Sequence, residues 1–104
     1  MLFRSRVVEA GGVRFAVTHR RDGGETGLAM FGRSRGADVV VFGHSHRPTV
    51  VETDDVTLLN PGSHADPRGN PVAHAELHPS DRGVRGELRA RDGRVLREFR
   101  VEGR

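Results

Sequence analysis

The first 36 residues show the pattern of a hairpin followed by a helix. Two short apolar runs, 7–10 and 13–17, flank Gly11-Gly12, and a diglycine between such runs is typical of a tight β-hairpin turn. After a polar segment, Thr26 can cap the first turn of a helix, and Gly36 can end that helix. We therefore predict two antiparallel strands and then one helix.

Residues 38–42 form a continuous apolar run that is rich in β-branched side chains. Such a run suits a strand that is buried on both faces. A strand, a helix and a second strand in this order form a βαβ unit, in which a helix joins two parallel strands. The pattern therefore predicts a fold of the α/β class.

The rest of the chain predicts further strands, separated by turn signals at Asp54-Asp55, 60–63 and Asp92-Gly93. In the run 72–78, successive side chains of a strand would point to opposite faces, so Ala73, Ala75 and Leu77 should share one face, and Val72, His74, Glu76 and His78 the other. The predicted strands cover 49–52, 56–59, 72–78, 84–90 and 95–101. No linker separates these elements, and we expect a single domain over residues 1–104.

Histidines follow two of the predicted strands directly. The segment Gly43-His44-Ser45-His46-Arg47-Pro48 comes after the strand 38–42, and His19 comes after the strand 13–17. The carboxyl ends of parallel strands meet at one edge of a sheet, and neutral imidazole is a common metal ligand. His19, His44 and His46 are therefore candidate metal ligands, and the alternative is that they are simply exposed.

Two sequence motifs, by their order along the chain and their spacing, resemble those of a known family. The segment 42–48, followed by Leu58-Leu59-Asn60-Pro61-Gly62-Ser63, resembles the calcineurin-like metallophosphoesterases, in particular their YfcE-type branch of small phosphodiesterases. The diglycine hairpin that leads to Val17-Thr18-His19 is similar to that branch as well. The resemblance covers about residues 7–63, and it implies two packed sheets flanked by helices.

The resemblance also implies chemistry: a phosphoesterase whose two divalent metal ions bind the substrate phosphate and activate a hydroxide. Carried over to this chain, His19 and His44 would bind one metal ion and His46 the other. Mn²⁺ is the expected cation, with Ni²⁺, Zn²⁺ or Fe²⁺ as alternatives. Arg47 would either contact a substrate phosphate or be merely exposed, and 60–63 would be a structural loop beside the site. The expected substrate is a phosphate-ester small molecule or a nucleotide.

The chain departs from the family upstream of these motifs. It has no Asp-x-His motif, and Gly69-Asn70 follows the histidines instead of preceding them. We therefore expect a partial domain, the C-terminal half of the family fold, that works with a complementary N-terminal half or as a homo-oligomer. The alternative is an inactive remnant that acts as an interaction module. We also expect the strand 38–42 to expose an edge and a face, which would make the isolated chain marginally stable.

Composition disfavours several other functions. The chain has no Cys, so it forms neither disulfides nor thiolate zinc sites. No apolar run approaches the roughly 20 residues that span a bilayer, and we expect a soluble cytoplasmic protein without membrane contact. The net charge is +3, the arginines are spread among Asp and Glu, and the aromatic residues are five Phe, so nucleic-acid binding is disfavoured. His64, His74 and His78 lack ligand spacing and are expected at the surface.

Overall fold

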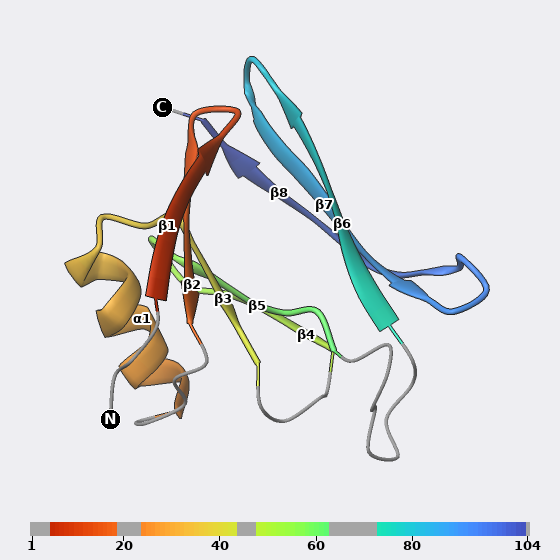
Figure 1. Cartoon of the computed structure of the whole chain (residues 1–104), viewed down its shortest axis with the longest axis horizontal. Helices are drawn as coiled ribbons and strands as arrows, with labels where there is room; N and C mark the ends of the chain where they lie inside the picture. Colours follow the sequence, from red (N-terminus) through yellow and green to blue (C-terminus); the bar gives the residue numbers. More distant parts are fainter. Residues whose placement is uncertain (1–4, 19–23, 44–47, 63–72, 104) are drawn as a thin grey trace.

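The computed structural model describes residues 5–18, 24–43, 48–62 and 73–103, which form eight strands and one helix (Figure 1). No helix within these residues is long and apolar enough to cross a membrane. The elements are β1 (Ser5–Ala10), β2 (Val13–Thr18), α1 (Gly24–Ser34), β3 (Val39–Phe42), β4 (Thr49–Glu52), β5 (Thr57–Asn60), β6 (Ala73–Ser80), β7 (Gly83–Ala90) and β8 (Val95–Glu102).

The strands form two sheets. Sheet A has the order β1-β2-β3-β5-β4, and sheet B has the order β6-β7-β8. In sheet A, β2, β3 and β5 run parallel, whereas β1 and β4 pair antiparallel at the two edges. The elements β2, α1 and β3 form the predicted βαβ unit, and the predicted α/β class is confirmed. The continuous apolar run of β3 fits its place between two other strands.

The helix α1 ends where the sequence predicts, but it begins earlier. It starts at Gly24, two residues before the predicted cap at Thr26. At its end, Gly36 has a φ of 64°, and the Ala37 amide donates a hydrogen bond of 2.8 Å to the Gly32 carbonyl. This arrangement is the Schellman motif, in which a residue with positive φ satisfies the last carbonyls of a helix.

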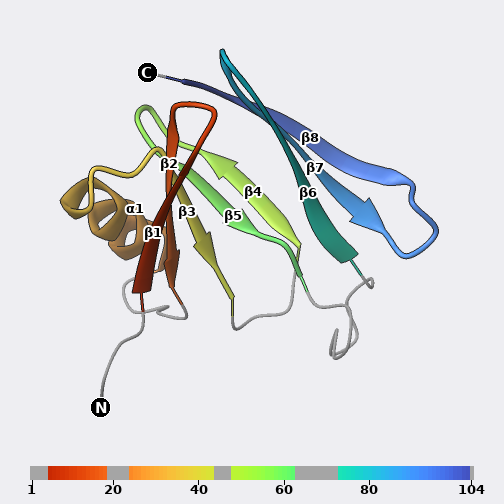
Figure 2. The same cartoon turned by 45° about the horizontal axis from the view of Figure 1, so that its top comes forward.

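A glycine on α1 allows the helix to approach sheet A closely (Figure 2). A Cβ atom at Gly32 would lie 2.6 Å from the Val40 side chain and 3.2 Å from that of Val56, so a larger residue there would push the helix away. This contact explains a residue that lowers intrinsic helix propensity. The core on this side of sheet A consists of Ala16, Leu28, Phe31, Ala37, Val40, Val56 and Leu58.

Sheet B covers the other face of sheet A (Figures 1 and 2). On β7, the inward residues include Gly86, and a Cβ atom there would clash with the ring of its cross-strand partner Phe99. The ring therefore lies over the glycine and fills the space between the sheets. The core between the two sheets consists of Val13, Phe15, Val39, Val50, Leu59, Val84, Leu88 and Phe99.

The expectation of an exposed edge and face at residues 38–42 is wrong. β3 is paired on both sides, because Val40 aligns with Ala16 of β2 and with Leu58 of β5. Val39 and Val40 are both 0% exposed, since α1 covers one face of the strand and sheet B the other. The chain itself supplies both neighbours of β3, so this argument for marginal stability fails.

The predicted hairpin of 84–90 and 95–101 is confirmed as β7 and β8, and β6 adds a second hairpin with β7 that the sequence did not predict. The Asp92-Gly93 pair forms the turn between β7 and β8, where the Gly93 amide donates a hydrogen bond of 2.9 Å to the Ala90 carbonyl. β6 extends two residues beyond the predicted end, through Pro79. Proline lacks a backbone donor and is tolerated there because β6 is an edge strand.

Candidate functional site

Three parallel strands of sheet A end side by side, at what we call the carboxyl edge. β2 ends at Thr18, β3 at Phe42 and β5 at Asn60. Thr18 and Phe42 are aligned in register, and Val41 is aligned with Leu59, so the three ends are level. The predicted parallel pairing of the strands before His19 and His44 is therefore confirmed.

The predicted metal ligands His19, His44 and His46 lie outside the described residues, as does Arg47. The structure describes the ends of the strands β2 and β3, which precede these histidines. β5 lies between β3 and β4 in sheet A. The segment 43–48, which carries two of these histidines, therefore joins strands on either side of β5.

A buried asparagine shapes the carboxyl edge after β5. Asn60 is 1% exposed, and its Oδ1 accepts a hydrogen bond of 3.0 Å from the Gly62 amide, which makes an Asx turn. Gly62 has a φ of 80°, and a Cβ atom there would lie 3.1 Å from Cγ of Pro48 and 3.3 Å from Cβ of Ala73. The turn therefore packs between the segment before β4 and the start of β6, and the described part of 60–63 has a structural role.

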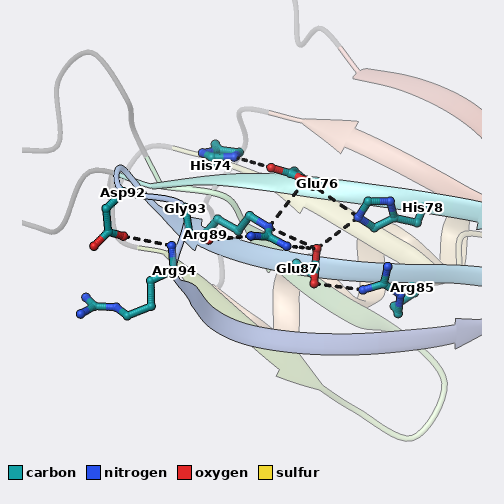
Figure 3. A network of polar contacts seen from close by, with 9 residues as sticks. All are labelled: His74, Glu76, His78, Arg85, Glu87, Arg89, Asp92, Gly93 and Arg94. Carbon is teal, nitrogen blue, oxygen red and sulfur yellow. Dashed lines mark hydrogen bonds and ion pairs between the residues drawn. The ribbon is translucent and has the colours of Figure 1, made fainter.

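A second cluster, the sheet B network, lies on the face of sheet B that points away from sheet A (Figure 3). Its centre is Glu87, which is 5% exposed. Nη1 of Arg85 and Nη2 of Arg89 each lie 3.0 Å from a carboxylate oxygen of Glu87, and Nε2 of His78 lies 3.1 Å away. The network consists of His74, Glu76, His78, Arg85, Glu87 and Arg89.

Hydrogen bonds within the sheet B network lower the pKa of both carboxyl groups. The hydrogen bond from His74, 2.9 Å long, lowers the pKa of Glu76, with partial desolvation acting in the opposite direction. The bond from Arg89 is the main cause that lowers the pKa of Glu87, and His78 and Arg85 add to it. Both carboxylates are therefore ionised at neutral pH, where they neutralise the neighbouring guanidinium groups.

Glu76, His78 and Glu87 also form a group that could hold a metal ion, because one ligand atom of each lies within 4.8 Å of the others. Carboxylate and imidazole ligands suit several divalent cations. However, Arg85 and Arg89 already bond to the same carboxylates and would repel a cation. The group fits an ion-pair network better than a metal centre.

The sequence reasoning missed this network, although it placed His74 and His78 correctly at the surface. Their side chains are 38% and 43% exposed. The alternation in 72–78 does put them on one face with Glu76, as predicted. The contact of His78 with Glu87 follows from the register of β6 and β7, which the alternation alone does not define.

The comparisons with known proteins agree with the motifs. A family model, described as the calcineurin-like phosphoesterase superfamily domain, matches residues 2–81. The chain belongs to this superfamily. The matched range includes both 42–48 and 58–63, the segments on which the resemblance was based, and that resemblance is confirmed.

Curated relatives of the superfamily share part of their length with this chain. A probable metallophosphoesterase of Methanothermobacter thermautotrophicus is 40% identical over 68 residues, which are 62% of this chain and 40% of the relative. A phosphodiesterase of Methanocaldococcus jannaschii is 38% identical over 55 residues, 53% of this chain and 32% of the relative. The chain therefore spans less than half the length of these relatives.

Solved structures share the fold. A predicted phosphoesterase of Streptococcus pneumoniae matches with a TM-score of 0.74 at 24% identity, over 93% of this chain and 62% of that protein. Vps29 of Entamoeba histolytica, solved with zinc, matches with a TM-score of 0.74 at 23% identity, over 94% of this chain and 59% of that protein. At these identities the likeness concerns the fold, and it confirms the architecture of a calcineurin-like phosphoesterase.

Proposed function

We propose that the carboxyl edge carries part of the metal site of a phosphoesterase, with His19, His44 and His46 as ligands. The observation that carries this proposal is the parallel alignment of Thr18 with Phe42. These two strand ends lie within two residues of His19 and His44 in the sequence. Membership in the superfamily supports the chemistry, because its family model spans all three histidines.

Divalent cations bound at this edge would supply a Lewis acid for the phosphoryl group and lower the pKa of a bound water. The chain's part is to offer neutral imidazoles, and because protons compete with the cations for these ligands, metal binding should weaken as the pH falls. The Asx turn at Asn60 and its contact with Pro48 fix the end of the segment 43–48. We propose that Arg47 contacts a phosphate oxygen of the substrate, a phosphate-ester small molecule or a nucleotide.

We propose Mn²⁺ as the cation, with Zn²⁺, Ni²⁺ and Fe²⁺ as alternatives, because imidazole suits all four. Three imidazoles are few ligands for two metal ions. We therefore propose that this chain is a partial domain whose further ligands come from a complementary N-terminal half or from a second copy. Without such ligands, the chain would act as an interaction module. The cytoplasm fits a sequence that needs no oxidising compartment.

The test is hydrolysis of bis-p-nitrophenyl phosphate by the purified chain with added Mn²⁺. We expect His44→Ala and His46→Ala to abolish the metal-dependent rate. His64→Ala is the matched control, since the same change at a histidine outside the proposed ligand set should leave the rate unchanged. If the wild-type chain shows a metal-dependent rate, the same rate in all three variants would disprove the assignment of the ligands.

A second arm separates the enzyme from the interaction module. If the chain alone shows no turnover, the N-terminal half of the Methanothermobacter relative is added as a separate polypeptide. Metal-dependent turnover that appears only in the mixture, and disappears with His44→Ala, supports a partial domain. Absence of turnover in the mixture, together with a stable complex in size-exclusion chromatography, supports the interaction module.

A further inference from the structure

The outer face of sheet B carries its charges in rows that cross the strands. The residues His78, Arg85 and Arg100 are register partners on β6, β7 and β8, so they form a basic row. Two residues further along the strands, toward the carboxyl edge, an acidic row follows. It consists of Glu76, Glu87 and Glu98.

A hollow of about 750 Å³ is lined by the three residues of the basic row and by the turn from β6 to β7. Its basic lining residues are Arg82 from that turn, Arg85, Arg100 and His78. Among the described residues that line it, Glu102 is the one acidic side chain. Since Glu87 neutralises Arg85, the guanidinium groups of Arg82 and Arg100 and the carboxylate of Glu102 leave a charge of +1 with His78 neutral.

Two of these arginines are available to a ligand. Arg85 bonds to Glu87 at 3.0 Å. In the part of the chain that the structure describes, however, no carboxylate bonds to the guanidinium of Arg82 or Arg100, and both residues are exposed. A guanidinium presents its donors in a planar fork that matches the oxygens of a phosphate group.

The hollow is separate from the carboxyl edge. Ala73, at the start of β6, lies against the Gly62 turn of that edge, whereas Ser80, at the end of β6, lines the hollow. Seven residues of strand separate the two positions, which is about 23 Å at 3.3 Å per residue. The distance excludes one phosphate group contacting both places.

We propose that this hollow binds a compact phosphate-bearing anion, such as inorganic pyrophosphate or a phosphorylated small molecule. Aligned residues on adjacent strands have Cα atoms about 5 Å apart, so Arg85 and Arg100 can reach the same phosphate group, and Arg82 closes the end. Acidic side chains stand on both sides, with the acidic row on one and Glu102 on the other. They would repel the repeated phosphates of a nucleic-acid strand, which favours a small anion.

The experiment is calorimetric titration of the metal-free chain with inorganic pyrophosphate in the presence of EDTA. Removing one charge-assisted contact should weaken binding at least about tenfold, and we expect this of both Arg100→Gln and Arg82→Gln. The matched control is Arg94→Gln, at the turn between β7 and β8 at the other end of sheet B (Figure 3), which should bind like the wild type. Circular dichroism checks that each variant is folded.

Three outcomes overturn the proposal: no saturable binding by the wild type, unchanged binding by both folded variants, or tighter binding of a single-stranded oligonucleotide than of pyrophosphate. The result is independent of the proposed phosphoesterase site. His44→Ala should abolish hydrolysis while leaving metal-free pyrophosphate binding unchanged. If pyrophosphate binding is instead lost in His44→Ala and kept in Arg100→Gln, the anion binds at the carboxyl edge and the hollow is not a site.

Discussion

The carboxyl edge of sheet A and the outer face of sheet B are both polar, but their polar groups are arranged in opposite ways. At the edge, parallel strands bring together residues more than 20 positions apart, and Asn60, which is buried there, fixes the backbone of the turn. On sheet B, the charged groups sit within antiparallel strands and neutralise one another. The polar groups of the sheet B network therefore already have partners within the sheet, whereas the carboxyl edge positions the segments that carry the proposed ligands.

Asn60→Ala tests how much the Asx turn at the carboxyl edge stabilises the fold, and it is the substitution with the largest expected effect. The substitution removes the acceptor of the Gly62 amide, in a part-buried bond whose acceptor, the Asn60 side chain, is 1% exposed. Loss of this bond and of the buried side-chain amide costs about 2 kcal/mol. Urea unfolding should therefore show a free energy of unfolding lowered by about that amount.

The matched control is Asp92→Ala, which removes the same kind of turn bond at an exposed site on sheet B, where the Arg94 amide donates a hydrogen bond to Asp92 Oδ1. We expect a change within about 0.5 kcal/mol there. Equal losses at the two sites would show that burial does not distinguish the edge from sheet B.

Gly62→Ala tests the same turn, and we expect a smaller loss of stability. Gly62 has a φ of 80°, and an added Cβ atom would lie 3.1 Å from Pro48. A residue other than glycine in this conformation costs about 1–2 kcal/mol. Urea unfolding should show this loss, whereas Gly43→Ala, which meets nothing within 4 Å, should cost less. The reverse order would show that the turn does not pack tightly at the edge.

Lowering the pH tests how much the sheet B network contributes to stability. The pKa values of Glu76 and Glu87 lie below the ordinary 4.5 in the folded chain. The folded chain therefore binds fewer protons than the unfolded chain. Their contribution to stability is fully present above about pH 4.5 and is lost as the pH falls through the lowered pKa values.

Urea unfolding across this range should show a fall in stability on acidification that is shallower in Glu87→Gln than in the wild type. The control is Glu52→Gln, on β4, which is exposed and should retain the steep fall. An equally steep fall in both variants would show that the sheet B network does not contribute to the acid sensitivity.

Much of this fold was predictable from the sequence, because local signals decided it. The apolar run of β3 and the Asp92-Gly93 turn both led to the correct element. The pairing of β3 on both sides was not predicted, since it depends on β5 inserting between β3 and β4. Local patterns do not encode such a sheet order, and so the expected exposed edge was wrong.

The candidate site was predicted in part for the same reason. The apolar runs and the strand–helix–strand order placed His19 and His44 after parallel strands, and the pairing of those strands is confirmed. The sheet B network depends on which residue of β6 faces which residue of β7, and a shift of one position would move every side chain to the other face. The pairing of Glu76 with Glu87 could therefore be found only in the structure.

The smallest expected effect belongs to an isolated ion pair, and it sharpens the contrast with the sheet B network. Nε of Arg33, on α1, lies 2.8 Å from Asp55 in the turn between β4 and β5, and both side chains are about half exposed. Water and salt screen such a pair, and ordering its two side chains costs entropy. Asp55→Asn should therefore leave the urea midpoint almost unchanged at physiological salt, although the ion pair lowers the pKa of Asp55.

Glu87→Gln should lower the midpoint measurably, because it leaves Arg85 and Arg89 without their shared carboxylate. Equal shifts in the two variants would mean that Glu87 behaves as an ordinary surface acid despite its burial.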